Sequence, residues 1–131
     1  MIRATSELAN YQTCFSDGNH QSISDAATDN GGGGTGFRPH DLLEAALANC
    51  LNITIRMYAN RHSIPLRQLT TKVDLDRTRP DEAVFRYEVA LEGELTPEQK
   101  QKLLSAAKGS PVLKTLLMKI SVERASDTTS P

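Results

Sequence analysis

Apolar and polar residues alternate over two neighbouring stretches in the second half of the chain, residues 69–76 and 84–92. The inward positions of the first stretch are Leu69, Thr71, Val73 and Leu75. Those of the second stretch are Phe85, Tyr87, Val89 and Leu91. Strict alternation is typical of a strand with one buried and one wet face. With the turn residues Arg79-Pro80-Asp81 between them, the pattern predicts an antiparallel hairpin over residues 69–92.

Residues 39–62 form the longest stretch without a helix breaker inside it. Pro39 stands at the front, where a helix tolerates proline because that N–H has no partner in any case. At 1.5 Å per residue, the predicted helix is about 36 Å long, enough to cross a small domain. At 100° per residue, the side of the helix that carries Cys50 is the more apolar one. Its members are Leu43, Ala46, Leu47, Ile53, Thr54, Met57 and Tyr58.

Helix-start signals occur twice in residues 97–118. Thr96 can act as N-cap, with Pro97 at the first helical position and Gln99 in the capping-box position. This helix is expected to end at Gly109, and Ser110-Pro111 then repeats the start signal for a short helix. Two helices are therefore predicted.

The two ends of the chain are less strongly patterned. Residues 1–27 predict a hairpin, with strands around Tyr11–Phe15 and Gln21–Ser24; because two strands alone are marginal in water, it requires a further partner, which another subunit can supply. Residues 119–124 alternate again and predict a last strand, followed by a disordered tail over 125–131.

A glycine-rich segment, TDNGGGGTGFR, joins the first hairpin to the long helix over residues 28–38. A phosphate-binding P-loop would end in Gly-Lys-Ser or Gly-Lys-Thr, and a dinucleotide fingerprint would follow an apolar strand. Neither context is present, which favours a flexible connector over a nucleotide site. The order of hairpin, long helix, hairpin, two helices and strand predicts one α+β domain over residues 1–131.

Composition excludes several partners. The formal net charge is −1, from 15 basic and 16 acidic residues, which gives no reason to expect binding to nucleic acid or to an anionic membrane. No apolar run reaches transmembrane length, and the first ten residues lack the apolar core of a signal peptide. Two cysteines do not make a disulfide scaffold, so a reducing, cytoplasmic location is expected. No Cys/His spacing of zinc type occurs, and neither a metal nor another cofactor is expected.

Cys50 is the main candidate for chemistry, and its surroundings leave two interpretations open. Free cysteine is among the most buried residue types, so Cys50 can be a structural core residue. It lies too far from the helix N-terminus for the helix dipole to lower its pKa. A reactive thiolate at this position would need a cation delivered from elsewhere.

The segments GGTGFRPHDLLEAALANC, RMYANR and AAKGSPVLKTL, in this order, resemble the osmotically inducible protein C and organic hydroperoxide resistance (OsmC/Ohr) family. The resemblance covers nearly the whole chain. It implies the OsmC-like fold, in which an antiparallel sheet wraps around a long central helix and two subunits form an intertwined homodimer. It also implies thiol peroxidase activity on organic hydroperoxides.

By this resemblance, Cys50 is the peroxidatic thiol, which becomes a sulfenic acid when it attacks a peroxide. A second cysteine would then form a disulfide with it, but the resolving position reads Ser110 in this chain. A serine forms no disulfide, so an external thiol reductant is expected to resolve the sulfenic acid. Cys14 could substitute only if its Cα lies within about 7 Å of that of Cys50.

Members of the family place a Glu, paired with an Arg, against the reactive thiol. Here the acidic residue after the proline is Asp41, with His40 before it, and Arg38 is the candidate cation. Asp41 lies about 13 Å from Cys50 along one helix, so the two would meet only between antiparallel helices of two subunits. Simpler interpretations remain: Arg38 as a solvated loop residue, and Asp41 as an acid that complements the helix dipole.

Two functions follow from the resemblance. The first is an OsmC-like thiol-dependent peroxidase that reduces a small hydrophobic peroxide through Cys50. The alternative is a non-catalytic OsmC-like protein that binds a small hydrophobic ligand at the dimer interface, which the missing second cysteine and the missing Glu favour. Fold alone does not decide between them.

Overall fold

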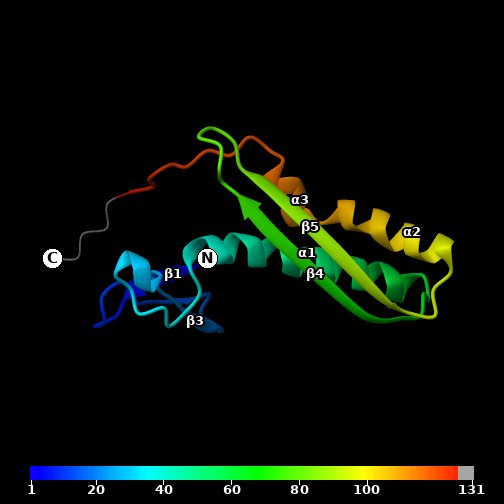
Figure 1. Cartoon of the computed structure of the whole chain (residues 1–131), viewed down its shortest axis with the longest axis horizontal. Coiled ribbons are helices and arrows are strands. Elements are labelled where there is room, and N and C mark those ends of the chain that lie inside the picture. Colours follow the sequence, from blue (N-terminus) through cyan, green and yellow to red (C-terminus); the bar gives the residue numbers. More distant parts are fainter. Residues whose placement is uncertain (127–131) are drawn as a thin grey trace.

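The computed structural model of the protein describes residues 1–126 and has an α+β architecture built on one long helix (Figure 1). The strands are β1 (Arg3–Ser6), β2 (Thr13–Ser16), β3 (Gln21–Ser24), β4 (Leu66–Asp76) and β5 (Val84–Gly93). The helices are α1 (Pro39–Arg61), α2 (Pro97–Ala106) and α3 (Pro111–Leu116), with 3₁₀ turns η1 (Thr28–Asn30) and η2 (Ala107–Gly109). The predicted fold class, with antiparallel sheets and a long helix, is confirmed.

The strands form two separate antiparallel sheets, ordered β1-β2-β3 and β4-β5. Figure 1 shows the first sheet at one end of α1. Strands β4 and β5 run along α1, and the helices α2 and α3 pack beside α1. The β4–β5 hairpin agrees with the predicted one and is longer by a few residues at its open end.

The core is centred on one stripe of α1. Leu47, Leu51, Ile55 and Ala59 recur every four residues and are buried. They pack with further buried residues from the hairpin and from α2 and η2, namely Ile64, Leu66, Leu103 and Ala107. Because a four-residue repeat stays on one side of a helix, this stripe faces the sheet and the short helices along its whole length.

A polar row on α1 meets the backbone of β4. The Leu75 N–H donates to Glu44 Oε2 over 2.9 Å, and Asn52 Nδ2 donates to a β4 carbonyl at 3.1 Å. Arg56 Nη1 donates to the Leu66 carbonyl over 2.7 Å. Backbone groups of a strand need partners when they are covered, and these side chains supply them. The row thereby fixes the position of α1 along β4.

The N-terminal region differs from the prediction because it has three strands instead of two. Strand β1 was missed since its residues, Arg3–Ser6, are polar and all exposed, so they show no buried face. It pairs with β2 from Arg3↔Ser16 to Ser6↔Thr13.

The glycine-rich segment, expected to be a flexible connector, is instead folded around a buried carboxylate. Asp25 is 3% exposed, and its oxygens accept hydrogen bonds from the N–H groups of Ala26, Gly33 and Thr35 at 2.8–3.2 Å and from Thr35 Oγ1 at 2.8 Å. At Gly32, an added Cβ would collide with the Ala26 carbonyl. The glycines therefore allow a tight approach of backbone to backbone.

The predicted starts of α2 and α3 are confirmed. The Gln99 N–H donates to Thr96 Oγ1 over 3.1 Å and the Thr96 N–H to Gln99 Oε1 over 3.0 Å, which is a capping box. The α-helix ends at Ala106, and η2 continues to Gly109 as predicted for the helical segment.

The predicted strand over residues 119–124 is wrong for the single chain. These residues run as extended backbone without strand pairing, and Ile120 and Val122 are 60% and 95% exposed. A strand needs a neighbouring edge to pair with, and the described chain brings none to this segment. Most of the predicted tail, 125–131, lies outside the described residues. Among the residues described, no helix is both long and apolar enough to cross a membrane.

Candidate active site around Cys50

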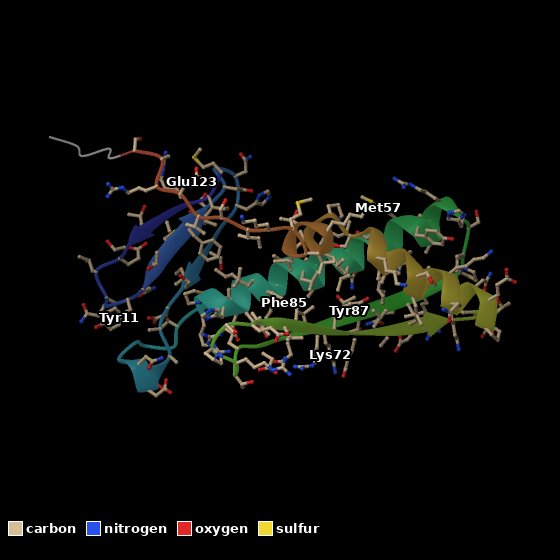
Figure 2. The ribbon with its side chains drawn as sticks, turned by 90° about the horizontal axis from the view of Figure 1, so that it is seen from above. Tyr11, Met57, Lys72, Phe85, Tyr87 and Glu123 are labelled. Atoms are coloured by element: carbon tan, nitrogen blue, oxygen red, sulfur yellow. The ribbon has the colours of Figure 1, made fainter. Side chains whose placement is uncertain are left out.

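Cys50 lies midway along α1, at the border between its buried stripe and an exposed apolar stripe. The exposed apolar stripe consists of Leu43, Ala46, Ile53 and Met57. Its three large members are 46–55% exposed. In Figure 2, Met57 lies on the side of the molecule opposite Phe85 and Tyr87 of the β4–β5 hairpin. Cys50 itself is half-buried, so it is not sealed in the core.

The pKa of the Cys50 thiol lies below its ordinary value. Burial acts to raise this pKa, and hydrogen bonding with the Ser110 side chain, the Val112 backbone N–H and the Thr54 side chain lowers it by more. A lowered pKa favours the thiolate, which is the reactive form of cysteine.

Thr54, Ser110 and Val112 lie at the junction where α1 and α3 are in contact. Thr54 follows Cys50 by four residues and therefore lies on the same side of α1. Pro111 has no N–H, so the first free N–H of α3 is that of Val112. The next N–H, of Leu113, donates to Ser110 Oγ over 3.2 Å. Ser110, at the resolving position of the predicted site, is fully buried at the N-cap of α3 and carries a hydroxyl in place of a thiol.

Arg38 and Asp41 lie together at the N-terminus of α1 and are not brought to Cys50 of the same chain. Arg38 Nη2 contacts Asp41 Oδ1 at 2.8 Å, and the Arg38 N–H donates to Asp41 Oδ2 over 2.9 Å. The hydrogen bonds from Arg38 hold the pKa of Asp41 below its usual range. His40 is exposed beside them. Among the described residues of the same chain, no arginine or histidine contributes to the lowered pKa of Cys50. Their role at a partner's thiol stays a prediction.

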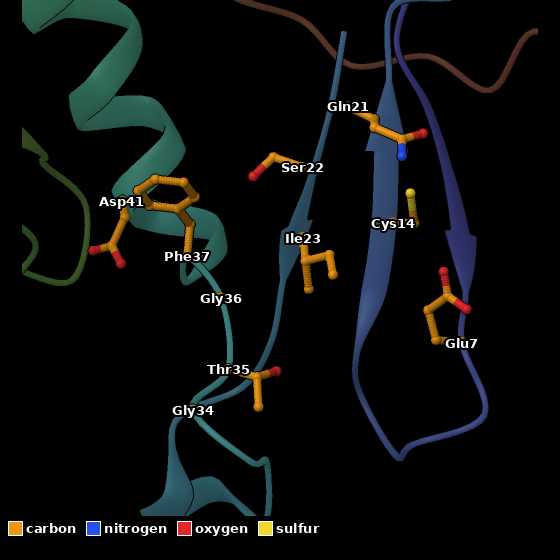
Figure 3. A pocket seen from close by; sticks show the side chains of 10 residues that line it. All are labelled: Glu7, Cys14, Gln21, Ser22, Ile23, Gly34, Thr35, Gly36, Phe37 and Asp41. Carbon is orange, nitrogen blue, oxygen red and sulfur yellow. The ribbon is translucent and has the colours of Figure 1, made fainter.

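Cys14 lies on β2, opposite Ile23 of β3, and both cysteines are free. It lines a pocket of about 770 Å³ together with Glu7, Phe37 and Asp41, between the N-terminal sheet and the start of α1 (Figure 3). Cys50 does not line this pocket. Within one chain, the thiols therefore belong to different sites.

A shallow groove of about 500 Å³ opens beside the candidate site. Thr54 lines it, as do Met57 and Tyr58 of α1, and Gly109 and Pro111 form the opposite wall. Thr54 lies one helical turn from Cys50 and lines the groove, so a small molecule in the groove would lie near the Cys50 site. Among residues 1–126, no three His, Cys, Asp or Glu side chains are placed to hold a metal ion.

Sequence reasoning placed Thr54 on the Cys50 side of the helix but assigned it no contact, and it missed the Val112 N–H altogether. The four-residue spacing from Cys50 is a signal for Thr54. The signal for Val112 is weaker: a proline after Ser110 withholds one N–H and leaves the next to make an external contact.

Comparison with known proteins places this geometry in context. A family model described as OsmC-like protein matches residues 31–124. A solved osmotic stress induced and detoxification response protein from Psychrobacter arcticus is 25% identical, with a TM-score of 0.73 over 87% of this chain and 85% of that one. No curated protein matches this chain in sequence.

Two further solved structures share the fold. An OsmC-like protein from Mycoplasma pneumoniae is 20% identical, with a TM-score of 0.75 over 88% of this chain and 85% of that one. An organic hydroperoxide resistance protein OsmC from Legionella pneumophila is 22% identical, with a TM-score of 0.63 over 89% and 88%.

Proposed function

The chain belongs to the OsmC-like protein family, and we propose that it is a thiol-dependent peroxidase that reduces organic hydroperoxides through Cys50. One observation carries the proposal: Cys50 is a free, half-buried thiol, and hydrogen bonding holds its pKa below the ordinary value despite burial. A thiolate at neutral pH is what attack on a peroxide requires. The names of similar structures, which include detoxification and organic hydroperoxide resistance proteins, support the same assignment.

The proposed reaction has two stages. The Cys50 thiolate attacks the terminal oxygen of the hydroperoxide; the O–O bond breaks, the alcohol leaves after taking a proton, and Cys50 becomes a sulfenic acid. An external thiol then attacks the Cys50 sulfur and releases water, which leaves a mixed disulfide. A second external thiol displaces Cys50 and restores its thiolate. Two thiols are oxidised to one disulfide for each hydroperoxide reduced.

A homodimer is part of this proposal. The exposed apolar stripe of α1 flanks Cys50, and burial of such a stripe favours association. If two α1 helices pack antiparallel along it, the Arg38–Asp41 pair and His40 of one subunit lie toward Cys50 of the other. A guanidinium near the thiolate would lower its pKa further.

A second candidate function is a non-catalytic protein that binds a small hydrophobic ligand at the dimer interface. Two observations favour it: Ser110 replaces the resolving cysteine, and apolar side chains border the Cys50 site. This candidate predicts ligand binding without peroxide turnover.

The test compares three proteins with cumene hydroperoxide and dithiothreitol at neutral pH: the wild type, Cys50→Ser and Cys14→Ser. The peroxidase proposal expects turnover by the wild type and by Cys14→Ser, and none by Cys50→Ser. Equal, slow peroxide loss in all three would refute the peroxidase and favour the binding protein. Mass spectrometry after peroxide alone should place the added oxygen on Cys50.

A further inference from the structure

We propose that the groove beside Cys50 binds the external thiol, and that this thiol is a peptide-sized monothiol whose carboxylate is held by Arg61. The inference rests on the proposed function, because that reaction requires a thiol to enter from outside at every turnover. The groove has a volume of about 500 Å³ and is lined by α1 on one side and by residues of α2, η2 and α3 on the other.

Three lining residues of the groove form a row on the side of α1 that carries Cys50. Thr54, Met57 and Arg61 follow Cys50 by four, seven and eleven residues, which keeps them within about 40° of one direction on an α-helix. At 1.5 Å per residue, the Cα of Arg61 lies about 16 Å from that of Cys50 along the axis. A molecule that extends along this row contacts Arg61 at one end and approaches Cys50 at the other.

Arg61 gives the groove a positive end. Among residues 1–126, its guanidinium has no hydrogen-bond or ion-pair partner, and no Asp or Glu of this part of the chain lines the groove. Glu98 lines a neighbouring groove that shares Tyr58, but it is paired with Lys102 over 3.2 Å. A guanidinium without a counter-charge attracts a carboxylate, which it can bind through two parallel N–H donors.

Arg61 also lies in the last turn of α1, where a cation complements the negative end of the helix dipole. Two of the last carbonyls, those of Tyr58 and Asn60, already accept from the His62 N–H. Side chains of a helix lean toward its N-terminus, which carries the guanidinium toward Met57 and away from the helix end. Its place in the lining of the groove agrees with this direction. A role limited to the dipole leaves the groove side of Arg61 without a partner.

The length of the row favours a thiol of two or three residues. An extended peptide spans at most about 3.5 Å per residue, so a tripeptide reaches about 10 Å. The Arg61 side chain, which leans back along the helix, shortens the remaining distance to Cys50. A single amino-acid thiol is too short to contact both. Met57, Tyr58 and Pro111 offer apolar surface to the body of such a peptide.

The bound thiol carries out the second stage of the proposed reaction. Its sulfur attacks the sulfur of the Cys50 sulfenic acid; the S–O bond breaks, the oxygen takes the thiol proton, and water leaves. A second molecule of the same thiol then attacks the sulfur of the bound one. The S–S bond breaks and Cys50 leaves as the thiolate, so two monothiols become one disulfide. Because Cys50 is half-buried, its sulfur is open to this exchange.

The first test uses no peroxide and a Cys14→Ser background, in which Cys50 is the only thiol. The protein is incubated with oxidised glutathione, which carries carboxylates, or with bis(2-hydroxyethyl) disulfide, which carries none. The Cys50 thiolate attacks one sulfur, the S–S bond of the reagent breaks, and the other half leaves as a thiolate. Mass spectrometry follows the mixed disulfide in the background protein, Arg61→Gln and Arg67→Gln. Arg67→Gln is the matched control, because it removes the same charge from β4, where Arg67 contacts Glu92 at 3.8 Å.

Oxidised glutathione should react about fivefold more slowly with Arg61→Gln than with the background protein, a factor typical of one exposed charge pair. Arg67→Gln should react like the background protein, and the neutral disulfide should react equally with all three. High salt should remove most of the difference, because it screens exposed charges. In turnover with cumene hydroperoxide, kcat/KM for glutathione should fall by the same factor in Arg61→Gln, and kcat/KM for 2-mercaptoethanol should not change.

Three results would overturn the inference. The first is an equal rate with oxidised glutathione in the background protein and Arg61→Gln. The second is an equal loss in Arg67→Gln, which would indicate net charge instead of a site. The third is a dependence on Arg61 only for the reduction of a carboxylate-bearing peroxide, linoleic acid hydroperoxide, which would assign the groove to the peroxide.

The two tests separate this inference from the proposed function. If Arg61 sets the rate with oxidised glutathione but none of the proteins turns over peroxide, the thiol site stands and the peroxidase proposal fails. If peroxide is turned over and Arg61→Gln has no effect with either glutathione reagent, the peroxidase stands and the thiol site fails.

Discussion

Ile53 and Leu51 lie two residues apart on α1, and truncating each to alanine should affect the protein in different ways. Leu51 is fully buried in the core, whereas Ile53 is 55% exposed in the single chain. Leu51→Ala should lower the free energy of unfolding by about 3 kcal/mol, because it leaves a cavity. In an isolated subunit, Ile53→Ala should cost well under 1 kcal/mol, as is usual for surface positions.

The proposed dimer changes this expectation for Ile53. Full burial of an isoleucine side chain contributes about 1.5–3 kcal/mol, so covering the exposed half contributes about 1 kcal/mol per subunit. Two symmetric copies contribute about 2 kcal/mol, which corresponds to about a 30-fold weaker dimer in Ile53→Ala. Because association depends on concentration, the variant's thermal midpoint should fall below that of the wild type most clearly near the dissociation constant.

Sedimentation equilibrium over a range of protein concentrations, with thermal unfolding at the same concentrations, measures both quantities. Leu51→Ala serves as the control, since its direct effect on the subunit does not depend on concentration. A wild type that stays monomeric at every concentration would refute the use of the exposed apolar stripe as a dimer interface. The same holds if Ile53→Ala associates as tightly as the wild type.

Three further predictions follow from particular contacts. The pKa of Asp25 is lowered, first by the hydrogen bonds from the Thr35 hydroxyl and N–H. Ionised Asp25 therefore adds to the free energy of unfolding above its unfolded pKa of about 3.9. This added stability is lost as the pH falls through the lower pKa of the folded state. Thermal unfolding of Asp25→Asn should therefore show a reduced midpoint at pH 7 and a gap to the wild type that closes in acid. Ser110→Cys should form an intrachain disulfide with Cys50 after one equivalent of peroxide, seen by mass spectrometry as the loss of two hydrogens; a persistent sulfenic or sulfinic acid instead would show that the two positions do not meet. Arg38→Gln should raise the pH midpoint of Cys50 alkylation by iodoacetamide only at concentrations where the protein is dimeric, and an equal shift in the monomer would contradict a cation supplied by the partner.

The periodic parts of the chain were predictable because burial on one face leaves a repeat in the sequence. The β4–β5 hairpin and α1 follow from such repeats, and the capping box at Thr96 is a local signal that depends on no distant contact. Strand β1 has no buried face and so no repeat to detect. Residues 119–124 show the opposite case, in which a strand pattern is present but residues 1–126 of the single chain provide no edge for it.

The sequence allowed the central residue of the candidate site to be predicted, but not the groups that surround it. Cys50 and position 110 were identified by resemblance, while the expected activation came from a charged group. Within one chain, hydrogen bonding with Ser110, Thr54 and the Val112 N–H lowers the pKa of Cys50, and the contact between α1 and α3 that brings these residues together has no pattern in sequence. Asp25 was missed for a similar reason, since the ring of donors around it forms only when the glycine-rich segment folds back.

An oxygen in place of a sulfur at position 110 divides the two steps of the proposed reaction. A hydroxyl donates a stronger hydrogen bond than a thiol and is not oxidised, and hydrogen bonding with Ser110 lowers the pKa of Cys50, so a serine is compatible with the first step. The same atom cannot form the disulfide that would close the cycle within one chain. Resolution must then come from outside, and the half-exposed Cys50 beside a groove that Thr54 lines is open to a small external thiol. A serine here is therefore compatible with peroxidase chemistry, at the cost of dependence on a second molecule for every turnover.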